Sequence, residues 1–311
     1  MTITDVLEVR RLLILSAVAQ HGSLAAAARY LGYTQPAVSH HIHRLEAEAG
    51  VRLIARDGRG VTLTDAGRML VVHAEAIAAE LAVAEAQLAT RARSAAGQVR
   101  LATLPCSNAS LVADALADLA ARDPKITVSL VEARPEQSVA LLERAECDLA
   151  VAFTHATLPL PSNNLVTVPL LDDPLFIMLP AAHSLAGSKE VDLERLATEP
   201  WITSRRCHPW TLHICALAGF TPAIALSTDD YQAAARLVAA GLGVSLTSFS
   251  ASKNAHHLDV ALIPVSGIAP RQILAALPAT PRPSRAVNAV LHALQRAAAS
   301  IANNGSRCEP A

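Results

Sequence analysis

A short polar run in the first fifty residues offers the chemical groups that read a DNA base edge. Amide side chains such as that of Gln35 pair with adenine through two hydrogen bonds, and the major groove of double-stranded DNA is wide enough to admit a helix. Gln35 is therefore the best candidate base reader, and the neighbouring hydroxyl and imidazole groups can reach phosphates or base edges. A polar, solvated helix face is the alternative interpretation. The candidate DNA-contacting residues of this run are Thr34, Gln35, Pro36, Ser39, His40, His43 and Arg44.

Helical periodicity places this run on the third helix of a helix-turn-helix. Apolar residues at helical spacing predict a first helix over residues 7–20, and Ser23 is placed to cap a second over residues 24–31. Thr34 is placed to cap the third helix, in whose first turn Pro36 costs no hydrogen bond. The stripe of this helix that we expect to face the core consists of Val38, Ile42, Leu45 and Ala49, with the polar candidates opposite.

A hairpin is expected after the third helix. Two β-prone runs, residues 51–55 and 61–64, flank an Asp-Gly turn, and a hairpin following a helix-turn-helix is a wing. Arg56 and Arg59 near its tip could meet phosphates or enter a minor groove, although arginines in turns are often only solvated. Residues 1–68 contain eight arginines and six acidic residues, a charge of +2, whereas the rest of the chain carries -3. The charge balance favours the DNA-binding interpretation.

The segment from Leu7 to Leu70 resembles the DNA-binding part of LysR-type transcriptional regulators. A Thr-Gln-Pro start, an Arg-Leu-Glu exit and a Leu-Thr-x-x-Gly close occur in the order found in that family. The resemblance implies an all-α winged helix-turn-helix head that binds an operator as part of a homodimer or homotetramer. His40, His41 and His43 stand where the family commonly has Arg, Gln or Lys. Because histidine ordinarily titrates near pH 6.5, one hypothesis is that DNA binding strengthens in acid.

A long linker helix should follow the wing. Thr64 is placed to cap a helix from residue 65 to about residue 92, in which apolar residues alternate by four and three like a heptad seam. We expect this seam to form an antiparallel helix pair in a dimer, as the resemblance implies, in preference to packing against its own domain. The seam consists of Leu70, Ala74, Ile77, Leu81, Ala84 and Leu88.

The remainder of the chain alternates strands and helices, which predicts a mainly parallel sheet covered on both faces. A break near residues 157–164 separates two such units, so the expected fold is a two-lobed α/β domain of the periplasmic-binding-protein type. It resembles the effector domain of LysR-type regulators over almost its full length. The expected boundaries are a head at 1–64, a linker helix at 65–96 and an effector domain at 97–311, with lobe I at 97–164 and 265–311 and lobe II at 165–264.

Two strand ends are expected to face each other across the crevice between the lobes, where helix N-termini present free amides to anions. Hydroxyls and a guanidinium near these ends suggest a small, anionic effector, although a Ser or Thr there can be merely a helix cap. Asp229 and Asp230 could line the crevice or cap the helix that follows. The candidate effector-binding residues are Thr103, Cys106, Ser107, Thr203, Ser204, Arg205, Asp229 and Asp230.

Cysteine and histidine residues leave two alternatives open. Cys207, His208, His213 and Cys215 crowd into nine residues, but their spacing does not match a usual zinc pattern. Cys207 with Cys215 is also the only candidate pair for a redox sensor, which would need a thiol of low pKa. No nucleophile elbow, phosphate loop or HExxH motif indicates an enzyme, and no cofactor or metal is expected. A bare solute-binding protein would share the lobes but lack the head.

The composition limits the class of protein. With 311 residues, 52% hydrophobic and 17% charged, the chain is too apolar to be disordered. Five cysteines without CxxC spacing suggest a reduced compartment. An apolar run over residues 12–19 imitates a signal peptide, but Asp5 and Glu8 stand where positive charge is expected. Without a stretch long enough to span a membrane, the expected location is the cytoplasm.

Overall fold

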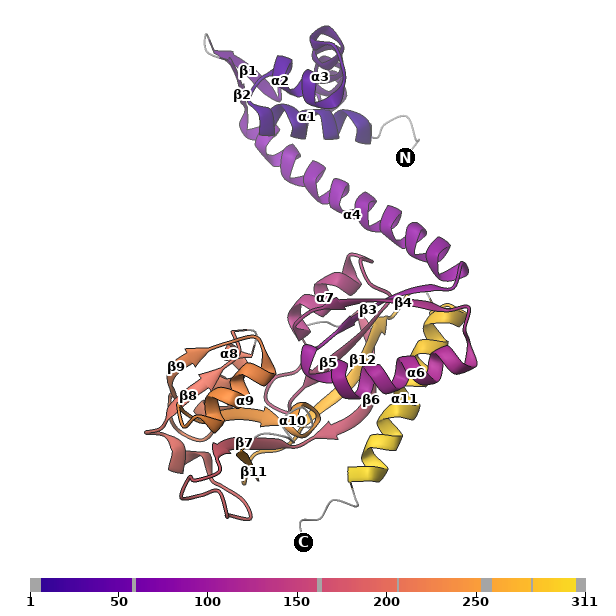
Figure 1. Ribbon diagram of the computed structural model, residues 1–311. Helices are drawn as coiled ribbons and strands as arrows, with labels where there is room; N and C mark the ends of the chain where they lie inside the picture. The colour runs from indigo at the N-terminus through magenta and orange to yellow at the C-terminus, as the bar shows by residue number, and fades with distance from the viewer. Residues whose placement is uncertain are drawn as a thin grey trace. The chain divides into compact units, whose positions relative to one another are not determined.

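Two units, Met1–Ala86 and Gln87–Ala311, make up the chain in the computed structural model, and each is described by itself (Figure 1). The structure describes residues 7–57, 60–160, 164–205, 207–252, 259–280 and 282–305. Across these residues, none of the helices combines the length and apolar content that a membrane span requires.

The first unit is a helical bundle with a two-stranded wing. Ser23 Oγ accepts a hydrogen bond from the Ala26 amide and Thr34 Oγ1 accepts one from the Ala37 amide, so both predicted helix caps are confirmed. The elements are α1 (Val9–His21), α2 (Leu24–Leu31), α3 (Gln35–Ala49), β1 (Ile54–Asp57), β2 (Gly60–Leu63) and the first part of α4 (Asp65–Ala95).

The core of this unit is built on the predicted stripe of α3. Val38, Ile42 and Leu45 are fully buried and pack with residues of α1, α2 and α4. The antiparallel wing pairs Ile54 with Leu63 and is shorter than predicted, because its first strand begins at Ile54 and not at residue 51. The predicted helix-turn-helix and wing are therefore both present.

The start of α4 packs tightly under the wing. Thr64 Oγ1 accepts a hydrogen bond from the Gly67 amide and donates one to the Arg52 carbonyl, which confirms the predicted cap. A Cβ atom at Gly67 would lie 2.1 Å from the Leu53 carbonyl oxygen, so only glycine fits this close approach. This contact gives a physical reason for the glycine of the Leu-Thr-x-x-Gly motif.

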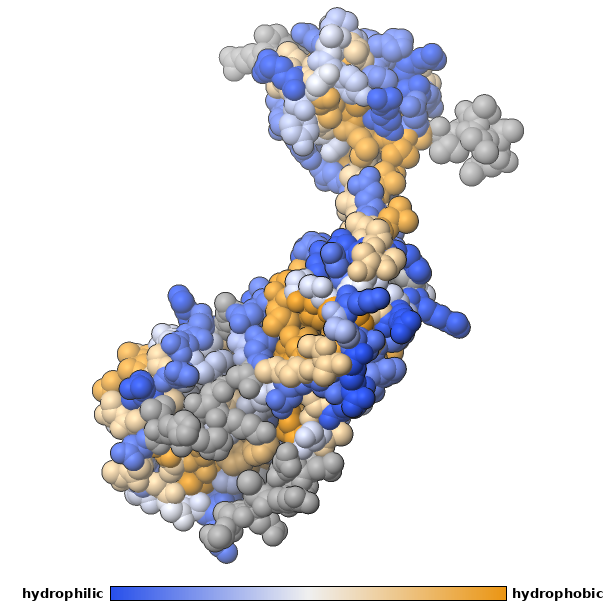
Figure 2. Space-filling model, turned by 45° about the vertical axis from the view of Figure 1, so that its right-hand side comes forward, coloured by the Kyte–Doolittle hydropathy of each residue, from blue (hydrophilic) through white to orange (hydrophobic). Residues whose placement is uncertain are grey.

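The predicted seam of α4 divides into two parts. Leu70 and Ala74 are buried in the core of their own unit, contrary to the expectation that the whole seam faces a partner. The first turns of α4 pack against α1, α2 and α3 and complete the core of the bundle. Leu81 and Leu88 are exposed, at 45% and 70%, and Figure 2 shows pale and orange side chains on this stretch of α4.

The first lobe of the second unit contains a five-stranded sheet with helices on both faces. The strand order is β4-β3-β5-β12-β6. One face is covered by α6 and α11, whose apolar residues join one core cluster, and the other face is covered by α7. The elements are β3 (Gln98–Thr103), α5 (Pro105–Ser107), α6 (Ala113–Arg122), β4 (Thr127–Glu132), α7 (Pro135–Glu143), β5 (Leu149–Thr154), β6 (Leu165–Asp173), β12 (Arg271–Pro278) and α11 (Arg285–Gly305).

The second lobe is smaller and is also covered on both faces. Strands β10, β7 and β11 form an antiparallel sheet, and β8 pairs in parallel with β9. A bridge between Trp201 and Val244 connects the two sheets, which α8 and α9 cover from opposite sides. The elements are β7 (Leu175–Pro180), β8 (Pro200–Thr203), α8 (His208–Leu217), β9 (Ala223–Ser227), α9 (Tyr231–Ala239), β10 (Ser245–Ser248), α10 (Phe249–Ser252) and β11 (Val260–Pro264).

Two details differ from the prediction. The strands within residues 98–154 pair in parallel as predicted, but the five-stranded sheet is mixed, because β12 runs antiparallel to both β5 and β6. Residues 165–173 also belong to the sheet of the first lobe and not to the second, because β6 pairs with β12 along its length. The chain therefore crosses between the lobes after Asp173 and again before Arg271.

Candidate functional site

The exposed side of α3 carries the polar residues that the sequence singled out. Gln35 stands at the first position of the helix, where its side chain is exposed, and Ser39 is half-buried one turn later. His41, by contrast, is half-buried against the ring of Tyr33 at a centroid distance of 6.0 Å. The residues exposed on this side are Thr34, Gln35, Pro36, His40, His43 and Arg44.

Glu46 fixes the turn between α3 and the wing. Its buried carboxylate accepts hydrogen bonds from the Leu53 and Ile54 amides, at 2.9 and 3.3 Å, and from Arg52 at 3.0 Å. Burial by itself would raise the pKa of Glu46, but these hydrogen bonds and the Arg52 charge lower it below its ordinary value. His43 lies 3.4 Å from the same carboxylate. The ionised Glu46 therefore ties the polar helix to the wing.

The wing arginines are placed only in part. Arg56 lies in β1 and not in the turn, because Asp57 pairs directly with Gly60. Arg59, the second predicted wing contact, falls outside the described residues. The backbone of the wing therefore locates Arg56 beside the tip.

A cavity of about 420 Å³ lies between the two lobes of the second unit. Pro105 and Pro135, at the first turns of α5 and α7, line it from the first lobe, and Pro209 and Tyr231, at the first turns of α8 and α9, line it from the second. Its volume is within the range of small-molecule sites. Helix N-termini thus converge on the cavity, as the strand-end argument predicted.

Arg271 forms the floor of this cleft. Its guanidinium is buried, stacks over the Phe153 ring at 4.8 Å and pairs with Asp173 through Nε and Nη2 at 2.9 and 2.7 Å. Nη2 also contacts Cys106 Sγ at 3.4 Å and Ser248 Oγ at 2.7 Å. Although burial opposes its charge, the surrounding thiol and carboxylate raise the pKa of Arg271. Nη1 makes no hydrogen bond to any described residue, so it remains a donor for a ligand.

Polar groups of the second lobe complete the cleft wall. The Tyr231 hydroxyl lies 3.5 Å from Cys207 Sγ, and Ser204 Oγ donates to Asp229 at 2.8 Å. Burial raises the pKa of Tyr231, so its hydroxyl stays protonated and can donate. The cleft therefore offers the Arg271 guanidinium and the Tyr231 hydroxyl as hydrogen-bond donors, with the Phe153 ring beneath the guanidinium.

The structure brings some of the predicted effector residues together and separates others. Cys106, Ser204 and Asp229 line the main cavity, and Thr203 lines a smaller neighbouring cavity that shares several lining residues with it. The Arg205 side chain is 77% exposed and pairs with Asp229 from outside the cavity. The residues that do not line the cleft are Thr103 and Ser107, which are buried, Arg205, and Asp230, which caps α9 through hydrogen bonds from the Gln232 and Ala233 amides.

Sequence reasoning missed several residues that line the cleft. Arg271 begins an apolar strand, and a charged residue directly before a buried run is the one signal that could have marked it. The others sit at helix starts or strand ends whose neighbours only the fold identifies. The additional lining residues of chemical interest are Arg134, Phe153, Trp210, His213, Tyr231 and Arg271.

The proposed cysteine pair does not meet in this structure. Cys207 precedes α8 and Cys215 lies eight residues later in its buried face, about 12 Å away at the helical rise, whereas a disulfide requires Cα atoms within about 7 Å. Burial raises the pKa of Cys207 and raises that of Cys215 to about 12. His213 points elsewhere and bonds Thr157 at 2.8 Å. The described residues contain no group of three His, Cys, Asp or Glu side chains that could hold a metal ion.

Comparison with protein families matches both units. The family model described as bacterial regulatory helix-turn-helix protein, lysR family, matches residues 9–68. The model described as LysR substrate binding domain matches residues 92–299. The two matches coincide with the winged helix-turn-helix and with the two-lobed domain.

Individual relatives agree with the family matches. The HTH-type transcriptional regulator ShiR of Corynebacterium glutamicum (strain R) is 32% identical over 264 residues, which cover 82% of this chain and 88% of that protein. A probable hydrogen peroxide-inducible genes activator of Mycobacterium leprae is 30% identical over 240 residues and 76% of each chain. The solved structure of a Corynebacterium glutamicum OxyR C206 mutant is similar at a TM-score of 0.59 and 22% identity, covering 97% of this chain and 95% of that one. This last likeness concerns the fold.

Proposed function

This chain belongs to the LysR family of bacterial transcriptional regulators, and from that premise we propose which residues read DNA and which sense the effector. A DNA-binding helix-turn-helix and an effector-binding domain on one chain make it a ligand-modulated regulator. We assign base reading to Gln35, with Ser39, His40, His43 and Arg44 as further contacts on the same helix. The observation that carries this assignment is that the polar side of α3 is exposed while its apolar side forms the core.

The remaining DNA contacts are assigned to the edges of this surface. Thr34 and Pro36 begin α3, where they can approach a phosphate, and Arg56 and Arg59 belong to the wing. Leu81 and Leu88 are assigned to a helix pair that joins two copies of the chain, so that two copies of α3 can read two half-sites. The names of the relatives are those of regulators, and we assign no catalytic role to the chain.

The effector is assigned to the cleft between the lobes. Arg271 Nη1 and Arg134 make no ion pair with the described residues and both line the cavity, so they offer an anionic ligand two guanidinium groups. The Tyr231 hydroxyl adds a neutral donor, and Phe153 and Trp210 provide an apolar surface. We therefore assign a small aromatic or aliphatic molecule with an anionic group.

A thermal-shift screen of the full chain tests this assignment. A panel of small carboxylates at neutral pH should contain compounds that raise the melting temperature. The Arg134→Ala variant should lose this response. Arg195→Ala, which removes an exposed arginine on the second lobe, should keep it. A response that is equal in both variants would place the anion outside this cleft.

A further inference from the structure

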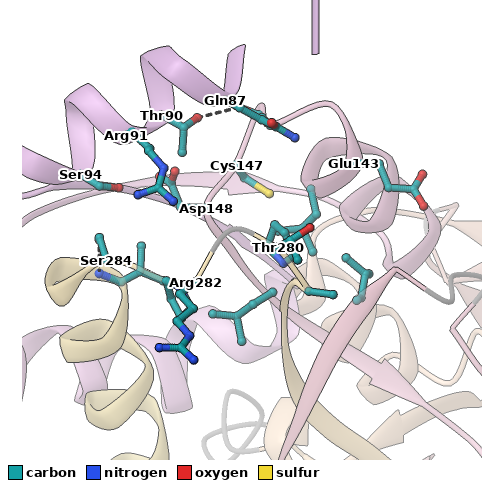
Figure 3. Close-up of a pocket in the computed structure, with 18 of the residues that line it drawn as sticks. Gln87, Thr90, Arg91, Ser94, Glu143, Cys147, Asp148, Thr280, Arg282 and Ser284 are labelled. Atoms are coloured by element: carbon teal, nitrogen blue, oxygen red, sulfur yellow. Dashed lines mark hydrogen bonds between the residues drawn. The ribbon is translucent and has the colours of Figure 1, made fainter. Parts of the chain in front are cut away.

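We propose that the second unit contains a second small-molecule site, formed by the last turns of α4 and the first lobe, which takes an apolar α-amino acid. This site goes beyond the effector cleft and does not depend on it. Its cavity has a volume of about 750 Å³ and shares no lining residue with the cleft (Figure 3). It lies at the ends of the first-lobe strands that are opposite to the cleft. Asp148 precedes β5 and Leu277 is near the end of β12, whereas the cleft contains Phe153 near the end of β5 and Arg271 at the start of β12.

One wall of the cavity is a polar face of α4. Gln87, Thr90, Arg91 and Ser94 follow the spacing of one helix face, and all four line the cavity. A helix face that serves only to pack on a core is apolar. Thr90 Oγ1 donates to the Ala145 carbonyl at 3.1 Å, which attaches this face to the first lobe. The face is therefore held against the lobe by hydrogen bonding and still presents polar groups to the space between them.

The opposite wall combines an apolar surface with the polar residues Glu143, Asn164, Thr280 and Ser284. Its residues come from α7, β6, β12, α11 and the segment between β12 and α11, and Figure 3 labels the polar ones Glu143, Thr280 and Ser284. Cys147 adds no charge to the cavity lining, because burial raises its pKa to about 12 and keeps the thiol neutral. An occupant must therefore be amphiphilic. The apolar lining residues are Leu142, Leu165, Leu277, Pro278 and Val287.

The buried carboxylate of Asp148 favours an occupant that carries a positively charged group. The side chain is 5% exposed, and Oδ2 accepts a hydrogen bond from the Arg100 amide at 2.6 Å. Oδ1 is buried, and no group in the described part of the chain donates to it. The nearby Arg100 side chain directs Nη2 to the Ala145 carbonyl. A buried carboxylate oxygen without a donor is costly, and an ammonium group supplies one with the complementary charge.

Two exposed arginines that line the cavity can bind an anionic group. Arg91 and Arg282 are exposed lining residues, and neither makes an ion pair or hydrogen bond with the residues that the structure describes. Figure 3 labels Arg91 and Ser94 on α4 among the residues that line the cavity. A guanidinium binds a carboxylate through two parallel hydrogen bonds. An ammonium at Asp148, a carboxylate at Arg91 and an apolar side chain on the opposite wall together describe an apolar α-amino acid.

Binding here would act directly on the linker helix. α4 is one helix from Asp65 to Ala95, and its first turns form part of the core of the DNA-binding unit. An occupant that bonds Arg91 and Ser94 would stabilise one packing arrangement of the last turns of α4 against the first lobe. The site therefore offers the regulator a second input, separate from the cleft.

Isothermal titration of the full chain tests the ligand class. L-phenylalanine and L-leucine are the probes. The control probes are 3-phenylpropionate, which lacks the amine, and phenethylamine, which lacks the carboxylate. We expect at least one amino acid to bind about ten-fold or more tightly than either control, because each control lacks one charge-assisted contact. Equal binding of the amino acids and the controls, or no binding of any probe at millimolar concentration, would overturn the proposal.

Variants locate the binding. Arg91→Gln changes an exposed residue and should fold normally, and it should weaken amino-acid binding about ten-fold. Ser94→Leu should block the cavity, and Asp148→Asn should remove the preference for the amine. Tyr231→Phe alters only the cleft and should leave this binding unchanged. Binding that survives Arg91→Gln and Ser94→Leu but is lost in Tyr231→Phe would assign the amino acid to the cleft instead.

Discussion

Arg271 and Asp173 form a buried ion pair at the point where both crossover segments join the two lobes. They face each other in the ladder between β12 and β6, and Arg271 Nη2 lies 2.7 Å from Asp173 Oδ2. Ser250 donates its amide and hydroxyl hydrogens to the same carboxylate, at 2.8 and 2.7 Å. The charge pair therefore holds the hinge strands together while Arg271 also faces the cleft.

Breaking this pair should destabilise the second unit. Asp173→Asn keeps the shape of the side chain but leaves the buried guanidinium without a counter-charge, which costs about 3–5 kcal/mol of the free energy of unfolding. Urea unfolding followed by tryptophan fluorescence reports on this unit alone, because both tryptophans, Trp201 and Trp210, lie in it. Arg144→Gln removes an exposed ion pair and should show no measurable change. A stable Asp173→Asn variant would show that the serine hydrogen bonds suffice.

Gln35 should determine which operator the head prefers. Gln35→Ala removes a side chain able to pair with adenine, so we expect a loss of about 1–3 kcal/mol in discrimination between the specific site and altered sites. Fluorescence anisotropy with DNA from the region upstream of the gene measures it. Gln20→Ala is the matched control, since Gln20 is an exposed glutamine on α1. Unchanged selectivity in Gln35→Ala would move base reading to another residue of α3.

Glu46 should make the wing junction sensitive to acid. Its folded-state pKa lies below the ordinary value of 4.5, so its ionised form contributes stability that is fully present above pH 4.5. This contribution is lost as the pH falls through the folded-state pKa. Hydrogen exchange of the peptide containing the Leu53 and Ile54 amides should be faster in Glu46→Gln than in the wild type at pH 7. The difference between the two proteins should narrow as the pH falls below 4.5, and a difference that does not change with pH would exclude ionisation as the cause.

The elements of this fold were predictable where the signals are local. Ser23 and Thr34 accept hydrogen bonds from amides three residues later, so the helix starts depend on neighbours in the sequence. The β6 strand was assigned to the wrong lobe because its partner, β12, lies about a hundred residues later. Leu70 and Ala74 fit a heptad and also fit a bundle wall, and only the fold decides between the two.

Local sequence signals predict even less of the effector cleft. Cys106 and Ser204 follow strand ends and are predicted by that rule, Thr203 ends a strand itself, and Asp229 is one of two neighbouring candidates of which only it lines the cleft. The rule also selected Thr103 and Ser107, which turn into the core, because it cannot tell which side of a helix start faces the crevice. Arg271 enters the site from a returning strand, and no local pattern connects it to Cys106, 165 residues earlier.

The exposed part of the α4 seam should join two chains. Leu81→Glu together with Leu88→Glu places two charges on the seam and should convert the oligomer to a species of about half the mass or less. Light scattering coupled to gel filtration measures this mass. Val72→Glu is the control, because Val72 is an exposed apolar residue of α4 that lies off the seam. Dissociation by the control alone would assign the interface to a different face of the helix.

Cys207 should react slowly with electrophiles and with peroxide. Burial raises the pKa of its thiol, so the thiolate that attacks either reagent is scarce at neutral pH. We expect alkylation by iodoacetamide at pH 7 to be about ten-fold or more slower than that of free glutathione, as measured by mass spectrometry of the peptide. Operator binding by the wild-type protein should then be as insensitive to peroxide as operator binding by Cys207→Ser. Rapid oxidation of Cys207 with loss of operator binding would instead favour a redox-sensing regulator. The half-buried position of Cys207, whose thiol contacts the Tyr231 hydroxyl, predicts the slower reaction.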